Sequence, residues 1–225
     1  MIELERHENV FVLTMVDGEN RWTTTFTRAF AKAIDEVAAS DGPAALVTAS
    51  AHEKFFSNGL DVEWIMGSDP DHPGGDRKTF GAEFMELMGR IITLPVPTVC
   101  AVNGHGFGAG FMSALCHDVR IMREDRGYWC LPEVDLKMPL PDNMIALLQA
   151  RYTKAVVHEA AVSGGRFNAA QCLERRLVDR AVPEDQVLPA AIEYAASQAN
   201  KDRSTLAGIK QALYKDVMPR LVRAK

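Results

Sequence analysis

Cysteine is scarce in this sequence, and no two cysteines lie at a spacing that marks a paired site. The four are Cys100, Cys116, Cys130 and Cys172, and they form no Cys-x-x-Cys pair. Such spacing fits neither a disulfide framework nor a zinc site. Free cysteine is among the most buried residue types, so we expect four reduced thiols in the core and no bound metal.

Long apolar runs and basic tracts are also missing. No run approaches the roughly 18 apolar residues that a membrane span needs, and residues 1–6 read MIELER, with charges where a signal peptide is apolar. The net charge is -5, and no cluster of lysine and arginine would follow a phosphate backbone. We therefore expect no membrane or nucleic-acid partner and a cytoplasmic protein, or a peroxisomal one if the source is a eukaryote.

The chain does contain enough apolar residues for one large core. Its 225 residues are 47% hydrophobic, an amount that suits a single domain. No low-complexity tract or interdomain linker interrupts it, and no Gly-x-Ser-x-Gly elbow of a serine hydrolase is present. We predict one domain over residues 1–225, with a core over residues 1–151 and a mostly helical region over residues 152–225.

The apolar pattern predicts strands and helices in a repeating order. Residues 2–16 alternate around a polar break, which predicts a hairpin whose second strand is buried on both faces. Residues 26–37 and 80–91 have helical spacing. Short buried strands are expected at residues 44–49, 98–102, 119–122 and 177–182. This order indicates an α/β protein built as a spiral of β-β-α units rather than simple β-α alternation.

Two turns after buried strands are expected to expose main-chain N–H groups. Residues 54–61, KFFSNGLD, lead into a short helix that Asp61 is expected to cap. Residues 103–110, NGHGFGAG, open a second helix. Unpaired N–H groups at a helix start favour negative charge, and glycine lets the backbone approach a ligand closely. Together the two turns would offer two N–H donors to one oxygen.

Each turn alone has simpler explanations. Both are compatible with tight connections that bind nothing. The second also resembles a dinucleotide site, but such a site follows the first strand of a β-α-β unit and has an acidic residue about 20 residues later. Residues 103–110 lie in the middle of the chain, which argues against a dinucleotide site.

Three segments together resemble the signature segments of the crotonase (enoyl-CoA hydratase/isomerase) superfamily. They are residues 56–61 (FSNGLD), 103–110 (NGHGFGAG) and 131–134 (LPEV), in the family's order and at nearly its intervals. Residues 134–142, VDLKMPLPD, also look like the same stretch of its monofunctional isomerases. The resemblance implies a crotonase-like fold, an acyl-CoA substrate, no separate cofactor, and a homotrimer or hexamer.

The resemblance also assigns roles to residues. The N–H groups of Leu60 and Ala109 would form an oxyanion hole for the thioester carbonyl, and Glu133 would be the acid/base residue. Burial among the apolar neighbours of Glu133 would raise its pKa, although a solvated loop glutamate is the alternative. The further candidates for substrate binding, with a solvated side chain as the alternative for the lysine and core packing for the larger apolar ones, are Lys54, Phe56, Ser57, Asn58, Gly59, Gly108, Gly110, Met112 and Trp129.

The second glutamate of the family's hydratases is missing, because Met112 stands at its position. Methionine can neither hold the attacking water nor move a proton. We therefore predict isomerisation of 3-enoyl-CoA to 2-enoyl-CoA: a proton leaves C2, a dienolate forms, and a proton returns at C4. The alternatives are another crotonase-type activity (hydratase, thioester hydrolase or decarboxylase) and an inactive acyl-CoA-binding scaffold.

Overall fold

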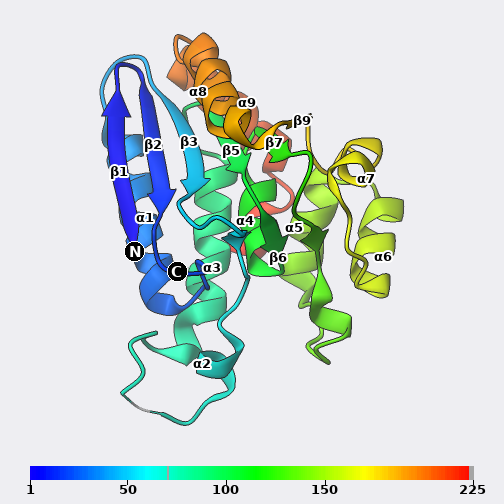
Figure 1. The fold of residues 1–225 in the computed structure, drawn as a ribbon. Helices are drawn as coiled ribbons and strands as arrows, with labels where there is room; N and C mark the ends of the chain where they lie inside the picture. Colours follow the sequence, from blue (N-terminus) through cyan, green and yellow to red (C-terminus); the bar gives the residue numbers. More distant parts are fainter. Residues whose placement is uncertain (70, 223–225) are drawn as a thin grey trace.

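Two β-sheets set the architecture of the computed structural model, which describes residues 1–69 and 71–222 (Figure 1). The larger sheet contains, in spatial order, β1 (Ile2–His7), β2 (Val10–Met15), β3 (Ala45–Ser50), β5 (Thr98–Val102), β7 (Val119–Arg123) and β9 (Arg180–Val182). The smaller sheet contains β4 (Phe55–Ser57), β6 (His105–Phe107) and β8 (Trp129–Cys130). Neighbouring strands are parallel, except that β1 and β2 form an antiparallel hairpin.

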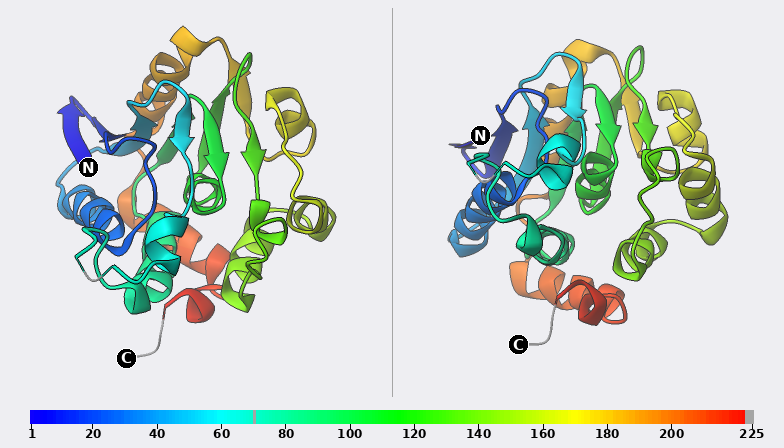
Figure 2. Two further views of the ribbon diagram at one scale, coloured as in Figure 1. Left: turned by 60° about the horizontal axis from the view of Figure 1, so that its bottom comes forward. Right: turned by 90° about the horizontal axis from the view of Figure 1, so that it is seen from below.

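Helices cover both faces of the larger sheet. They are α1 (Thr24–Ala39), α2 (Val62–Met66), α3 (Arg77–Ile92), α4 (Ala109–Leu115), α5 (Asp142–Arg151), α6 (Lys154–Ser163), α7 (Ala169–Glu174), α8 (Val187–Gln198), α9 (Arg203–Tyr214) and α10 (Met218–Leu221), with 3-10 turns η1 (Pro132–Val134) and η2 (Glu184–Gln186). In Figure 2, α8 lies on the side of the sheet away from α1 and α3. The alternation along β2 fits this arrangement, because Val10 and Val12 pack in the α8 layer while Phe11 and Leu13 pack in the α1 and α3 layer.

The strands confirm the predicted spiral. The units β3-β4, β5-β6 and β7-β8 each send their first strand to the larger sheet and their second strand to the smaller one. In the first unit, β1 and β2 both join the larger sheet. Since the three strands of the smaller sheet are parallel, the segments that follow β4, β6 and β8 leave it at one edge.

The C-terminal region joins these layers. As predicted, it is mostly helical with one short strand, β9, which pairs with β7. Lys210 of α9 is buried, and its Nζ donates to Asp118 Oδ2 (2.7 Å) and to the carbonyl oxygens of Leu94 (3.1 Å) and Val96 (3.0 Å). A buried ammonium with three acceptors ties α9 to the start of β5 and the loop before β7. The single domain and its division after residue 151 stay predictions.

The four cysteines are free and buried, which confirms the predicted core thiols. Burial raises the pKa of Cys116 to about 12 and that of Cys130 to about 11, so both thiols are protonated near neutral pH. Within residues 1–69 and 71–222, no helix is long and apolar enough to cross a membrane. The same residues hold no group of three histidine, cysteine or acidic side chains that is placed to bind a metal ion.

Candidate active site

The first strand-to-helix turn follows β4 and is braced by the loop between β2 and α1. Asn20 is buried there, and its Nδ2 donates to the carbonyl oxygen of Phe56 (3.1 Å). The Oγ of Ser57 donates to the carbonyl oxygen of Asn20 (2.7 Å), and the N–H of Asn58 donates to that of Glu19 (2.9 Å). These bonds hold the turn in one conformation.

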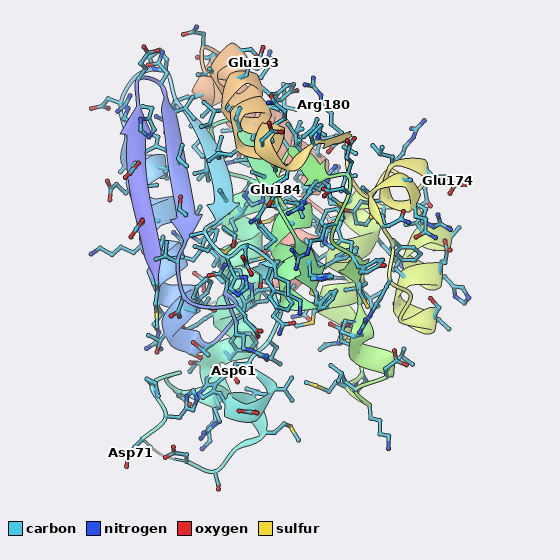
Figure 3. All side chains as sticks on the ribbon, in the orientation of Figure 1. Asp61, Asp71, Glu174, Arg180, Glu184 and Glu193 are labelled. Carbon is cyan, nitrogen blue, oxygen red and sulfur yellow. The ribbon has the colours of Figure 1, made fainter. Side chains whose placement is uncertain are left out.

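The same loop determines where the Leu60 N–H points. Trp22 donates its N–H to the Gly59 carbonyl oxygen (2.7 Å) and accepts one from Asp61 (3.0 Å). Because successive N–H groups of an extended chain alternate in direction, the Leu60 N–H points away from Trp22. It has no acceptor in the part of the chain that the structure describes. Asp61, at the start of α2 (Figure 3), accepts from the N–H of Trp64 (3.0 Å), which confirms its predicted role as a helix cap.

The second turn, after β6, lies directly against the first. Ala109 is the first residue of α4, so its N–H is one of those that a helix leaves without an internal partner. Gly59 has a φ of +82°, and a Cβ there would lie 2.7 Å from the Phe107 carbonyl oxygen and 3.7 Å from the Ala109 nitrogen. Only a residue without a side chain lets the two turns approach this closely.

Glu133, on η1, lies next to the second turn. A Cβ on Gly108, whose φ is +47°, would lie 3.0 Å from Glu133 Oε1, so glycine leaves room for the carboxylate. Its Oε2 is buried and, among the described residues, has no hydrogen-bond partner. Burial raises the pKa of Glu133 to about 6, as its apolar neighbours predicted. The carboxylate is therefore mostly ionised, but more basic than an ordinary glutamate, near neutral pH.

The two turns and the carboxylate line one reaction cavity of about 310 Å³. Six of the predicted site residues lie on its wall: Asn58, Gly59, Leu60, Gly108, Ala109 and Glu133. The structure thus brings together all three residues predicted to be catalytic. Two N–H groups that converge on one oxygen would stabilise negative charge on it, and a basic carboxylate beside it would take a proton from the adjacent carbon. An arrangement of this kind is chemically suited to forming an enolate from a carbonyl compound.

Comparisons with known proteins show which family the chain belongs to. A sequence model of the family described as enoyl-CoA hydratase/isomerase matches residues 5–225. The peroxisomal enoyl-CoA delta isomerase 2 of Arabidopsis thaliana is 30% identical over 224 residues, which cover 96% of this chain and 93% of the relative. The chain belongs to the enoyl-CoA hydratase/isomerase family. Enoyl-CoA delta isomerase 3 of the same plant is 28% identical, with 96% of this chain and 93% of the relative covered.

A solved structure supports the fold of this family member. A probable enoyl-CoA hydratase from Mycobacterium tuberculosis superposes with a TM-score of 0.88 at 22% identity, covering 98% of this chain and 91% of that one. This likeness confirms the predicted crotonase fold. The family match and the delta isomerase relatives confirm the prediction of a crotonase-type, isomerase-like enzyme.

Three predicted substrate-binding residues lie in the core rather than on the cavity wall. Phe56 and Trp129 are fully buried, and Met112 is only 1% exposed. The Trp129 ring packs against that of Phe111, with centroids 4.9 Å apart. The reason is packing: Met112 belongs to α4, all of whose residues are buried, while Phe56 of β4 and Trp129 of β8 belong to the same hydrophobic core. These side chains therefore contribute to the core and not to the cavity wall.

Three other predicted residues also lie off the cavity wall. Ser57 is buried and donates to the backbone of Asn20, and a Cβ on Gly110 would lie 2.7 Å from the Ser57 Cβ. Both residues therefore fix the distance between the two turns. Lys54 is exposed, with its Nζ 5.1 Å from the centroid of the Phe55 ring.

Several cavity residues were not singled out from the sequence. Arg21, Leu136, Met138 and Arg166 line the cavity from three different loops. The Arg166 guanidinium lies 5.6 Å from the centroid of the Phe107 ring, while Arg21 pairs with a neighbouring glutamate at 2.7 Å. Arg21 and Arg166 belong to no sequence motif, so nothing in the sequence marked them as cavity residues. For Leu136 and Met138, the one signal was that they lie close to Glu133 in the sequence.

Proposed function

We propose that the protein isomerises 3-enoyl-CoA to 2-enoyl-CoA, with Glu133 as its acid/base residue. The N–H groups of Leu60 and Ala109 stabilise the oxygen of the dienolate, while Glu133 takes the proton from C2 and returns it at C4. One observation carries the proposal: a single carboxylate of raised pKa shares a cavity with two converging turns. The delta isomerase names of the Arabidopsis thaliana relatives support the same reaction.

The wall of the cavity favours isomerisation over hydration. Among the described residues that line it, Glu133 is the one carboxylate. Met112, at the position of the hydratases' second glutamate, is buried and apolar. Water addition needs a group that orients the nucleophile as well as one that moves the proton. A reaction that only moves a proton between two carbons needs one such group, and it requires neither a metal nor a redox cofactor.

Positive charge near the cavity suits the phosphates of coenzyme A. Arg21 and Arg166 line the cavity. Burial lowers the pKa of His105, and the nearby positive charges of Lys54, Arg126 and Arg166 lower it further. We assign this group of cations to the pyrophosphate and ribose phosphate of the substrate. The trimeric or hexameric assembly stays a prediction.

A paired-substrate assay tests the proposed reaction. With trans-3-hexenoyl-CoA, we expect conversion to the 2-enoyl isomer, seen as a rise in conjugated-thioester absorbance. With trans-2-hexenoyl-CoA, we expect no net addition of water by mass spectrometry, because no second group orients it. Robust hydration of the 2-enoyl substrate would contradict the assignment, as would failure to shift the double bond of the 3-enoyl one.

The pH dependence of kcat/KM is expected to report the ionisation of Glu133. The base form is required, and burial raises its pKa to about 6, so kcat/KM should fall about tenfold per pH unit below that value and level off above it. Measuring initial rates between about pH 5 and 8, with tryptophan fluorescence as a check on folding, tests this expectation. A profile that stays flat across this range would mean that Glu133 is not the base.

A further inference from the structure

Residues 22–25, at the start of α1, bind two segments that are far apart in the sequence. The main chain of Trp22 is bonded to the first turn, as described above. The Oγ1 of Thr24 (2.7 Å), and the Oγ1 (2.8 Å) and N–H (3.0 Å) of Thr25, donate to main-chain carbonyl oxygens of residues 73–76. The first turn and residues 73–76 are therefore fixed to the same short stretch of chain.

Trp64 of α2 packs against residues 73–76. Its side chain is fully buried, and its Nε1 donates to the Gly75 carbonyl oxygen (3.2 Å). A Cβ on Gly74 would lie 2.5 Å from both Cδ1 and Nε1 of the indole ring, so an alanine there would have to displace the ring or the main chain. The indole also meets the ring of Phe80, on α3, edge to face at 5.6 Å between centroids. Trp64 thus lies in a site that other segments enclose closely.

The position of α2 depends on Trp64. This helix has five residues, and Trp64 is its buried one. So short a helix does not form alone, because most helical stability in proteins comes from tertiary packing. The main chain of Trp64 is bonded as well: its N–H donates to Asp61 Oδ1 (3.0 Å), and its carbonyl oxygen accepts from Arg77 Nε. One residue therefore fixes α2 through both its side chain and its main chain.

The helix α2 borders the reaction cavity. It begins at Val62, two residues after Leu60, and Val62 lies on the cavity wall. A shift of α2 would turn the peptide groups just before it and so change the direction of the Leu60 N–H. We infer that Trp64 is a positioning residue: through its contact with residues 73–76, it keeps the Leu60 N–H aligned with that of Ala109. This inference rests on the proposed function.

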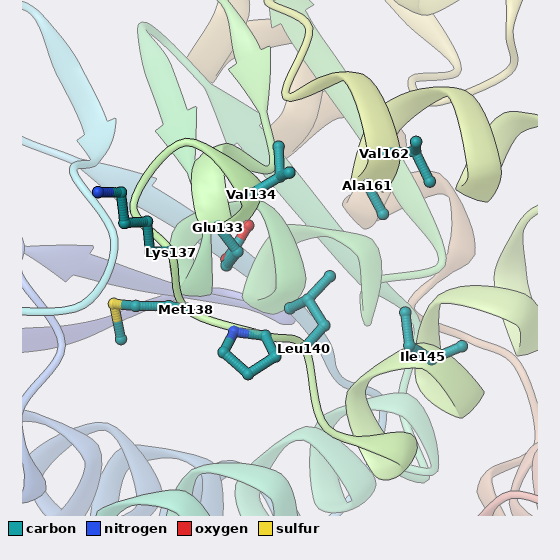
Figure 4. A pocket seen from close by; sticks show the side chains of 9 residues that line it. Glu133, Val134, Lys137, Met138, Leu140, Ile145, Ala161 and Val162 are labelled. Atoms are coloured by element: carbon teal, nitrogen blue, oxygen red, sulfur yellow. The ribbon is translucent and has the colours of Figure 1, made fainter.

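The catalytic carboxylate lies on other elements. Figure 4 shows Glu133 with the side chains around it, and these come from η1, the segment before α5, α5 and α6. A change at Trp64 therefore reaches the oxyanion donor without reaching the base. The pH midpoint of kcat/KM should stay where it is in the wild type.

Trp64→Phe tests the inference, because it removes the indole N–H and shortens the ring. We expect kcat for trans-3-hexenoyl-CoA to fall about tenfold, which is less than the about 10²- to 10³-fold cost of losing a donor completely. Infrared spectra of bound trans-2-hexenoyl-CoA report the cause, since hydrogen bonds to the thioester oxygen lower its C=O stretching frequency. This frequency should rise in the variant. Wild-type kcat and frequency in the folded variant would overturn the inference and leave Trp64 a role in stability alone.

Gly74→Ala disturbs the same contact from the other side. Its new Cβ would press on the indole ring, so kcat should fall and the C=O frequency should rise as in Trp64→Phe. The double variant should lose less activity than the product of the two single losses, because both changes break one contact. Losses that multiply would count against a shared contact with Trp64.

Val37→Ala is the control for stability. Val37 is a buried residue of α1 that does not line the cavity, so the change should lower the unfolding temperature and keep both kcat and the C=O frequency. Isomerisation by the wild-type protein decides the proposed function by itself. Because the infrared measurement needs binding and no turnover, failure of the proposed reaction and failure of the inference about Trp64 are distinguishable.

Discussion

Replacing Glu133 by glutamine is expected to lower kcat for 3-enoyl-CoA isomerisation by about 10²- to 10⁴-fold. The amide keeps the size of the carboxyl group but has no basic oxygen to take the proton from C2. Because burial raises the pKa of Glu133, the substitution also removes a charge that is costly to bury, so folding should not suffer. Steady-state kinetics measure the loss, and calorimetry with an acyl-CoA should show affinity within a few-fold of the wild type.

The matched control is Glu193→Gln, which makes the same change at an exposed position of α8 away from the cavity (Figure 3). Its kcat should match the wild type. Full activity in Glu133→Gln would exclude Glu133 as the acid/base residue. Loss of acyl-CoA affinity together with activity would mean that Glu133 acts mainly in binding.

Replacing Gly59 by alanine is expected to lower kcat by about 10²- to 10³-fold, the cost of losing one oxyanion donor. The new Cβ would lie 2.7 Å from the Phe107 carbonyl oxygen, and alanine disfavours the φ of +82°. The first turn must move away from the second, which takes the Leu60 N–H out of alignment with that of Ala109. The pH profile of the residual activity should keep its midpoint, because Glu133 is untouched.

Gly81→Ala is the control for this experiment. Gly81 lies in α3, where an added Cβ would meet no atom within 4 Å. This variant should keep wild-type kcat and unfold at the same or a slightly higher temperature, because alanine favours helix. Wild-type kcat in Gly59→Ala would show that the contact between the two turns does not position the donors.

The elements of the fold were predictable where one physical pattern determines them. The alternation from Val10 to Met15 predicted a strand buried on both faces, and its side chains do divide between two layers. The helical spacing of Phe26, Phe30 and Ile34 predicted α1, because these residues all face the core. The glycines of residues 103–110 marked the second turn, since a tight turn from a strand to a helix needs them.

Which side chains face the cavity was not predictable in the same way. Met112 lies near the second turn in the sequence and Trp129 lies near Glu133, but the directions of both side chains depend on how α4 and β8 pack in the core. Asn20 and Arg166 lie far from the signature segments in the sequence, and only the folded chain brings them to the site. The resemblance of three segments to the family's signature segments identified the turns and the carboxylate, whereas the remaining wall depends on tertiary packing.

The proposed oxyanion donors are main-chain groups, and this has a consequence for genetics. Any substitution at Leu60 other than proline changes the side chain and keeps the N–H, so a saturation scan would score this partly exposed position as tolerant, and the buried Ala109 should accept other small residues. Sensitivity would appear instead at Gly59 and Gly108, which have positive φ angles and carry no functional atom beyond the backbone. In this protein, intolerance to mutation should therefore mark the glycines beside the two N–H donors rather than the residues that carry these donors.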